Sequence, residues 1–293
     1  MIHRSAREDE PGPFPAEVLV RDLRALGLGE GDTVLCHVAL SKLGWLIGGR
    51  VALLQAIREV VGGLGTIVVP AFTTYLVDPA DWRARAVPAQ WWAEVRAAMP
   101  VFDPDLHSCQ PGLGTFPEVV RAHRCSRRSW HPVYSFAALG HRATALTGNL
   151  SLDYALGREG VLGRLVDAGV KVLALGLPWW RRCTLFHLAE SVAPFPGRRA
   201  QLVNVRVPDG AGPGARWVRT QQLVLHDGDF AEMGAGIRVA ARTGTVAAGE
   251  ATLVDGAEVV SRSAQWLMCH RDWRTIDWTR YGFATVPAPS CPV

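Results

Sequence analysis

Three residues suited to acid–base chemistry, Thr184, His187 and Glu190, recur at intervals of three in the segment TLFHLAE. In a helix this spacing places the histidine and the glutamate on neighbouring turns, and threonine is a favourable N-cap residue. The helix dipole keeps an imidazole in the first turn neutral and able to accept a proton, while a glutamate can hold the other ring nitrogen. The segment therefore predicts a general base with its orienting carboxylate, with an ordinary surface ion pair as the alternative.

Two further segments carry groups that could bind an anion. Residues 127–131, RRSWH, combine two guanidinium groups, a hydroxyl and an imidazole, which are donors that phosphate recognition uses. Residues 40–44, LSKLG, leave an expected strand, and Gly48 and Gly49 then open a helix whose backbone N–H groups would face an anion. A solvated basic loop and an ordinary connection are the alternatives. Six cysteines without a C-x-x-C pair, irregularly spaced from the histidines, favour free, mostly buried thiols over a metal site. A metal at Cys183 and His187, or at Cys269 and His270, is the alternative.

Composition excludes several classes of protein. The 293 residues are 48% hydrophobic and 20% charged, so the chain buries a large core and is neither disordered nor fibrous. The net charge of +4 is too small and too scattered for nucleic-acid binding. The longest uncharged stretch, 60–77, is interrupted by glycines and a proline, which is wrong for a membrane span. Residues 1–10 lack the apolar core of a secretory signal, so a cytoplasmic location is expected.

Alternating helices and strands must position the groups described above. The spacing of apolar residues predicts helices at 16–26, 51–61, 160–168 and 184–192. Continuous apolar runs predict strands at 32–39, 65–72 and 170–177. Strands without polar alternation belong to a sheet that is covered on both faces, which indicates an α/β fold. His187 then follows the carboxyl end of the last strand, where open α/β sheets bind ligands.

The other segments are less regular. Residues 78–114 are rich in proline and tryptophan and predict long loops, of the kind that often carry function, with a short helix at 90–98. Beyond residue 196 the pattern predicts four elements: strands at 201–207 and 216–224, and helices at 230–241 and 256–267. The sequence contains no recognisable linker or internal repeat.

Taken in order, several segments resemble the aminoglycoside 3-N-acetyltransferase family, acetyl-CoA-dependent antibiotic N-acetyltransferases that are distinct from the GNAT fold. The matching segments are GDTVLCHVALSKLGWLIGG, GTIVVPAF, MPVFDPDL, RRSWHPVYSFAALG, LGREGVLGRL, VLALGL, TLFHLAE and DGDFAEMG. Each segment is weak alone, but their common order is specific and spans nearly the whole chain.

This resemblance implies one α/β/α layered domain over residues 1–293, with a central mixed sheet and long active-site loops. It implies an enzyme that moves the acetyl group of its co-substrate acetyl-CoA to an amine of a small molecule, either an aminoglycoside or a related natural product. Such an enzyme acts in antibiotic resistance or antibiotic biosynthesis. We expect no metal, nucleic acid or membrane as a partner, and the oligomeric state is left open.

The resemblance also implies roles for particular residues. It makes His187 the general base, Glu190 its partner and Thr184 a neighbour of the thioester. The implied cofactor contacts lie in two loops, at Ser41, Leu43, Gly44, Arg128, Ser129 and Ser135. The residues expected to bind the acceptor are Tyr75, Asp78, Trp179, Trp180 and Arg181.

One departure from the family pattern concerns the acceptor. Residues 178–184 read PWWRRCT, where the family usually has a polar, glycine-containing run. Two guanidinium groups repel a polycation, so the departure predicts poor activity on aminoglycosides and a preference for a less cationic amine. The alternative is a conventional pocket lined by acids such as Asp78, Asp103 or Asp153. Two other hypotheses stay open: a non-aminoglycoside biosynthetic amine as acceptor, and a homologue that binds CoA without turnover.

Overall fold

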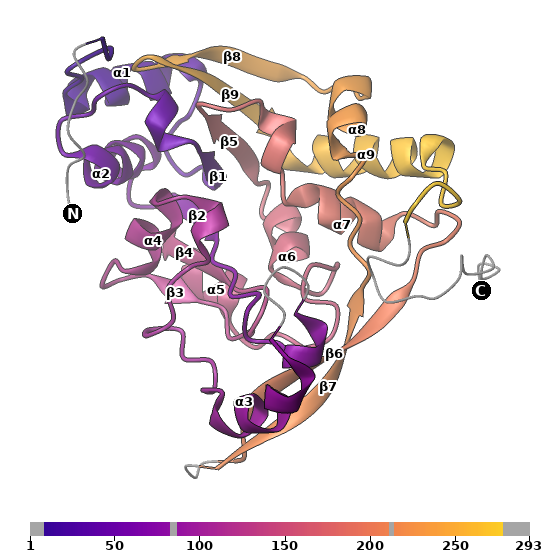
Figure 1. Ribbon diagram of the computed structural model, residues 1–293. Helices are drawn as coiled ribbons and strands as arrows, with labels where there is room; N and C mark the ends of the chain where they lie inside the picture. Colours follow the sequence, from indigo (N-terminus) through magenta and orange to yellow (C-terminus); the bar gives the residue numbers. More distant parts are fainter. Residues whose placement is uncertain (1–8, 83–86, 211–213, 278–293) are drawn as a thin grey trace.

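The computed structural model describes residues 9–82, 87–210 and 214–277, and a seven-stranded sheet forms its centre (Figure 1). The strands lie in the order β3-β4-β2-β1-β5-β9-β8. Their bounds are β1 Thr33–Val38, β2 Thr66–Pro70, β3 Arg127–Arg128, β4 Phe136–Gly140, β5 Lys171–Leu175, β8 Ala241–Val246 and β9 Gly249–Asp255. Strands β2, β1 and β5 are parallel, whereas β4 and β9 pair antiparallel with β2 and β5. The sheet is therefore mixed, as predicted.

Helices cover both faces of this sheet. Within the described residues these helices are α1 Ala16–Leu26, α2 Gly49–Val61, α4 Phe116–Arg121, α5 Ala143–Thr147, α6 Val161–Asp167, α7 Leu185–Val192, α8 Phe230–Gly236 and α9 Gly256–His270. One further helix, α3 Trp92–Ala98, lies apart from the sheet (Figure 1). In the first core, α1, α2 and α4 pack against Cys36 of β1. In the second core, helices α5, α6, α7, α8 and α9 pack against the adjacent residue, Leu35. Successive residues of a strand point to opposite faces, so an uncharged strand serves both cores. The predicted α/β/α layering is confirmed.

A separate two-stranded ribbon extends below the main sheet in Figure 1. It consists of β6 Ala200–Pro208 and β7 Ala215–Leu223, which pair antiparallel along their whole length. Arg206 of β6 donates hydrogen bonds of 3.0 and 2.8 Å to the carbonyl groups of Arg96 and Ala97, at the carboxyl end of α3. These bonds satisfy carbonyl groups that a helix end leaves unpaired, and they fix α3 against the ribbon.

The predicted elements before residue 200 are confirmed to within about two residues at their ends. The helix predicted at 230–241 is wrong in its second half, because α8 ends at Gly236 and the chain is extended at Ile237. Strands β3, β4, β8 and β9 and helices α4 and α5 were not predicted from the sequence. Strand β8 is an edge strand in which only Val246 is buried, so it lacks the apolar pattern that identifies a strand.

Candidate active site

The helix that carries His187 begins at the carboxyl edge of the parallel strands. The chain leaves β5 at Leu175, makes a short 3-10 turn at Trp179–Arg182 and enters α7 at Leu185. Four apolar side chains anchor this helix in the second core: Leu185, Phe186, Leu188 and Ala189. His187 is the partly exposed exception in this stretch, so it is directed away from the core.

The predicted contact between the histidine and the glutamate is present. Nδ1 of His187 lies 2.9 Å from Oε2 of Glu190. The glutamate side chain is fully buried, whereas the histidine side chain keeps 17% of its surface exposed. A carboxylate accepts hydrogen bonds, so Nδ1 carries the proton and Nε2 keeps the lone pair of the neutral imidazole. The geometry thus provides an oriented base.

The second carboxylate oxygen of Glu190 also accepts hydrogen bonds within the protein. Oε1 accepts a hydrogen bond of 2.6 Å from Nη1 of Arg271 and one of 3.1 Å from the backbone N–H of His226. Arg271 in turn forms a two-point pair with Asp229, at 2.7 and 2.6 Å. Sequence reasoning missed these partners because they lie 36 to 81 residues from Glu190 and no local pattern marks them.

A cleft with a volume of about 780 Å³ opens in front of His187. Its lining comes from several loops and from helices α7 and α8: Phe72, Gln110, Leu113, Tyr134, Leu156, Trp180, Arg181, Arg182, Cys183, Thr184, His187, Leu225, Asp227, Phe230 and Ala231. Cavities of this size bind small organic molecules. Two arginines, Arg181 and Arg182, face one aspartate, Asp227, in this lining, so the electrostatic field in the cleft favours negative charge.

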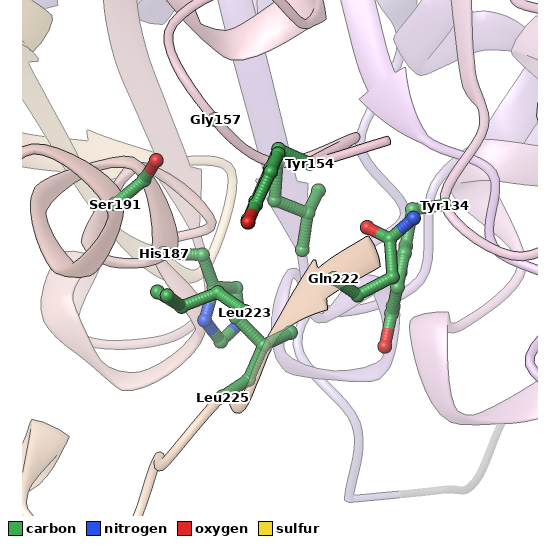
Figure 2. Close-up of a pocket in the computed structure, with 9 residues that line it drawn as sticks. Tyr134, Tyr154, Gly157, His187, Ser191, Gln222, Leu223 and Leu225 are labelled. Carbon is green, nitrogen blue, oxygen red and sulfur yellow. The ribbon is translucent and has the colours of Figure 1, made fainter. Parts of the chain in front are cut away.

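A much smaller cavity lies beside His187, as Figure 2 shows. In this view the imidazole faces Leu223 and Leu225 at the end of β7, and Tyr154 projects toward the space between them. The cavity has a volume of about 10 Å³, which is room for about one water molecule. Tyr154 has a left-handed backbone, with φ +50°, and its hydroxyl donates to Oε1 of Gln221 at 2.9 Å. Sequence reasoning also missed this residue.

Thr184 lies where it was predicted, at the entrance to α7 and in the wall of the cleft. It is only 7% exposed, and its hydroxyl has no hydrogen-bond partner in the described part of the chain. Its backbone N–H points to Nε2 of His37, 3.5 Å away. Burial, together with the charge of Arg182, lowers the pKa of His37 to about 4, so this imidazole is neutral. The free hydroxyl of Thr184 can therefore serve a bound molecule.

The three residues predicted as phosphate contacts beside β3 form hydrogen bonds within the protein. Arg128 donates to Oγ of Ser135 at 3.0 Å and to the carbonyls of Pro104, His107 and Ala71. Ser135 and Ser129 are fully buried, and Oγ of Ser129 accepts the N–H of Phe136 at 2.9 Å. These hydrogen bonds join three loops to each other, and a contact of the three residues with the cofactor stays a prediction.

His131, from the same RRSWH segment, is likewise structural. Its Nδ1 accepts the N–H groups of Val133 and Tyr134, at 3.1 and 2.9 Å. Its Nε2 lies 3.2 Å from the carbonyl of Leu152, to which it donates. Burial lowers the pKa of His131 to about 4, which keeps the ring neutral. His131, in the segment for which an anion site and a solvated loop were the two hypotheses, thus points inward and fixes the loop around Tyr134.

The other predicted cofactor loop lies at the correct edge of the sheet. Residues 40–44 follow β1, and Gly176 at the end of β5 packs so closely that a side chain there would meet Ala39 and Lys42. Ser41 is exposed, but Leu43 is fully buried in the first core, so only its backbone is available. Gly44 has φ +75°, and a side chain there would clash with the carbonyl of Pro11. Cofactor contacts at this loop remain a prediction.

The predicted acceptor residues separate into two groups. Trp180 and Arg181 line the cleft, whereas Trp179 is buried against Phe186 with its ring at 5.9 Å. Tyr75 lies outside the lining of this cleft, in a shallow apolar groove with Trp82. Neither Trp179 nor Tyr75 is in the lining of this cleft, and their contact with the acceptor stays a prediction.

The acids considered for a conventional pocket serve other purposes. Asp78 is 6% exposed and forms a two-point pair with Arg96, at 2.7 and 2.8 Å, which holds the pKa of the carboxyl below its ordinary value. Asp103 accepts backbone N–H groups in its own turn, and Asp153 accepts the N–H of Gln221. None of the three lines the cleft in the part of the chain that the structure describes, and the substrate-binding role of Asp78 stays a prediction.

The arrangement of side chains and helices also bears on metals and membranes as partners. In residues 9–82, 87–210 and 214–277 no three His, Cys, Asp or Glu side chains are grouped as a metal site requires. Among the helices of the same ranges, none is long and apolar enough to cross a lipid bilayer.

The mixed sheet and the cleft at its carboxyl edge define the class of protein: an α/β enzyme with a small-molecule substrate. Comparison with family models gives the particular family. The model described as aminoglycoside 3-N-acetyltransferase matches residues 35–268, and the chain belongs to this family of acetyl-CoA-dependent N-acetyltransferases. The predicted family, enzyme class and co-substrate are confirmed.

Two relatives are similar to this chain in sequence along most of their own length. The aminoglycoside N(3')-acetyltransferase-like protein YokD of Bacillus subtilis is 32% identical over 258 residues, which are 87% of this chain and 93% of YokD. Aminoglycoside N(3)-acetyltransferase VII of Streptomyces paromomycinus is 36% identical over 273 residues, covering 87% and 92%.

Solved structures of relatives have the same fold. The crystal structure of YokD superposes with a TM-score of 0.85 over 90% of this chain and 96% of that chain, at 31% identity. A binary complex of AAC-IIIb with CoASH gives a TM-score of 0.75 over 87% and 97%, at 32% identity. A structure of AAC-VIa bound to sisomicin gives 0.78 over 89% and 100%, at 28% identity.

Proposed function

We propose that this enzyme transfers the acetyl group of acetyl-CoA to the amine of a small molecule, with His187 as the general base and Glu190 as its orienting partner. One observation carries the assignment of the base. His187 is the only imidazole lining the large cleft in the described part of the chain, and its Nδ1 is held 2.9 Å from a fully buried carboxylate. That contact leaves Nε2 as the proton acceptor at the cleft.

The side chains then act in a simple sequence. Acetyl-CoA supplies a thioester carbon that an amine can attack. Nε2 of His187 removes a proton from the amine nitrogen as the nitrogen–carbon bond forms, and the carboxylate of Glu190 stabilises the resulting imidazolium. The carbon–sulfur bond breaks, and the imidazolium returns its proton to the departing thiolate, which restores the neutral base.

Thr184 fits the place of the thioester. Its hydroxyl is buried, lines the cleft and has no partner in the described residues, so it has a donor to offer. Negative charge develops on the thioester oxygen during the reaction, and a preorganised donor there lowers the barrier. The backbone of residues 40–44, at the same edge of the sheet, is the proposed contact for the CoA arm.

The test of the base is thiol release from acetyl-CoA with a panel of amines. His187→Ala should lower kcat by about two to four orders of magnitude, the range typical of losing a general base, while acetyl-CoA still binds. His141→Ala, at an exposed turn outside the cleft, is the matched control and should retain full activity. A near-normal kcat in His187→Ala would show that His187 is not the general base. Absence of thiol release with every amine would favour a CoA-binding homologue without turnover.

For the acceptor, we infer an amine with less positive charge than a typical aminoglycoside. Arg181 and Arg182 line the cleft, against a single carboxylate, that of Asp227, in the lining. Arg181 is exposed, and Arg182 donates to the carbonyl of Gly112, so neither guanidinium is neutralised by an acid in the part of the chain described. Each close pair of like charges costs about 1 kcal/mol even in bulk water.

Replacing both arginines tests this inference. Arg181→Gln with Arg182→Gln should raise kcat/KM for a multiply charged aminoglycoside roughly 5- to 30-fold, which corresponds to about 1–2 kcal/mol, and should leave a monoamine unaffected. Arg124→Gln with Arg127→Gln removes the same charge outside the cleft and is the control. A wild-type kcat/KM for aminoglycosides at or above about 10⁴ M⁻¹s⁻¹, the low end of ordinary enzymes, would show that the inferred acceptor class is wrong.

A further inference from the structure

A buried cluster of charges lies behind the His187–Glu190 pair. Arg271, just beyond α9, has a side chain that is 2% exposed, and it contacts both Glu190 and Asp229. Its Nη1 donates to Oε1 of Glu190 at 2.6 Å, while Nε and Nη2 donate to the two oxygens of Asp229 at 2.7 and 2.6 Å. The guanidinium also stacks over the ring of Phe195, at 5.0 Å. All of these contacts lie outside the large cleft.

We propose that Arg271 is a positioning residue of the acetyl transfer: it fixes the carboxylate of Glu190 so that Oε2 remains aimed at Nδ1 of His187. This inference rests on the proposed function, in which His187 is the base. A glutamate side chain can turn about three bonds, and a fully buried carboxylate held at one oxygen only would rotate or take up a proton. The bond to Arg271 leaves Oε2 as the oxygen available to the histidine.

The charges around the pair explain why a cation is needed there. Glu190 and Asp229 are two carboxylates that share one guanidinium, and Asp227 adds a third negative charge beside His226. Burial opposes the charge of Arg271, but the bonds to Asp229 and the charge of Glu190 raise its pKa above the ordinary value. Without this cation, the uncompensated carboxylates would favour the protonated form of both imidazoles in the cluster, His187 on Glu190 and His226 beside Asp229 and Asp227. A protonated His187 cannot act as the base.

The same guanidinium also anchors a wall of the cleft. Nη2 of Arg271 donates to the carbonyl of His226 at 3.0 Å, and the N–H of that residue donates to Glu190. Its two neighbours in the chain, Leu225 and Asp227, line the cleft. Arg271 therefore ties the carboxylate that orients the base to the segment that borders the acceptor.

Two substitutions separate the charge of Arg271 from its shape. Arg271→Met keeps the bulk without the charge, and we expect kcat to fall roughly 10- to 100-fold and the acid limb of the kcat/KM–pH profile to move up by about one pH unit. Arg271→Lys keeps the charge but has no planar fork, so kcat should fall about 3- to 10-fold with the acid limb in place. Arg262→Gln, which breaks the exposed α9 pair with Glu258, is the control and should behave as wild type.

Nitrogen NMR of His187 provides a readout that does not depend on turnover. The wild-type ring should carry its proton on Nδ1 at neutral pH, and Arg271→Met should show the imidazolium to higher pH, in step with the acid limb. A folded Arg271→Met protein with kcat within twofold of wild type, or with reduced kcat but an unmoved acid limb and ring titration, would overturn the proposal. If Arg271→Met does not fold, a folded Arg271→Lys protein with wild-type kcat would overturn it equally. If His187→Ala keeps its activity, the proposed function fails, yet the ring titration still decides whether Arg271 controls this pair.

Discussion

Replacing Glu190 by glutamine should lower kcat far more than the similar shape of the two side chains suggests. Oε1 of Glu190 receives two donors, the guanidinium of Arg271 and the N–H of His226. The amide oxygen of a glutamine must occupy that side, because its NH₂ group would face two donors there. The NH₂ group is then turned toward Nδ1 of His187, where wild type has an acceptor. Nδ1 has to accept, the ring proton moves to Nε2, and the lone pair no longer faces the amine.

The size of the effect follows from two losses. The neutral ring is held in the tautomer that cannot take a proton at Nε2, and the imidazolium formed in the reaction loses its carboxylate. A wrong tautomer combined with a missing counter-charge costs on the order of 10³-fold in kcat, or about 4 kcal/mol of transition-state stabilisation. Glutamine leaves the cleft unchanged, so the KM for acetyl-CoA should stay within about threefold of wild type.

Steady-state thiol release, combined with nitrogen NMR of the histidine ring, tests this reasoning. Glu190→Gln should show the ring proton on Nε2, and kcat should approach that of His187→Ala. Glu94→Gln, an exposed acid on α3, is the matched control and should retain wild-type kcat. A kcat for Glu190→Gln within tenfold of wild type, with the protein folded, would refute the argument that Arg271 and His226 dictate the orientation of this side chain.

Three other outcomes follow from contacts in the structure. Arg128→Ala should lower the free energy of unfolding by about 2–4 kcal/mol and leave the KM for acetyl-CoA nearly unchanged, because its donors bind protein groups; a large KM effect at normal stability would contradict this placement. Thr184→Val should lower kcat roughly 10- to 100-fold with little change in KM, and Thr184→Ser should recover most of the rate; equal kcat in both variants would exclude the hydroxyl as a donor. The folded pKa of His131 is about 4, below the ordinary value near 6.5, so the unfolded chain binds the extra proton first. The contribution of neutral His131 to the free energy of unfolding is therefore complete above about pH 6.5 and is lost as the pH falls toward 4. Denaturant titrations should show a smaller difference in this free energy between wild type and His131→Gln at pH 4.5 than at pH 7.

Local sequence determines the features that depend on short spacing. Continuous apolar runs and helical periodicity identified most elements before residue 200, because burial on two faces restricts strands to apolar residues. The interval of three between His187 and Glu190 determined their contact, since the pitch of a helix brings such residues together wherever the helix lies. The position of this helix after β5 also followed from the order of the elements.

The same kind of local reading does not determine the partners of the RRSWH segment. Arg128, Ser129 and His131 have the side chains of an anion site, but each finds its partners inside the protein. A guanidinium or hydroxyl donates equally well to a phosphate and to a backbone carbonyl, so residue type cannot distinguish the two. The loops that contain residues 71, 104 and 107 bring their backbone carbonyls to Arg128, which therefore donates to the protein.

Only the tertiary structure decided what surrounds the catalytic pair. Arg271 is 81 residues from Glu190 in the sequence, and it reaches the glutamate because α7 packs against α9 in the second core. A carboxylate with no exposure must be compensated by a cation and by hydrogen bonds, but the sequence does not say which of many arginines will supply them. Arg181 and Arg128 are the same residue type, yet Arg181 lines the cleft while Arg128 is enclosed by backbone carbonyls. Their different roles follow from packing, which assigns each cation its partner through contacts between distant segments that no local pattern encodes.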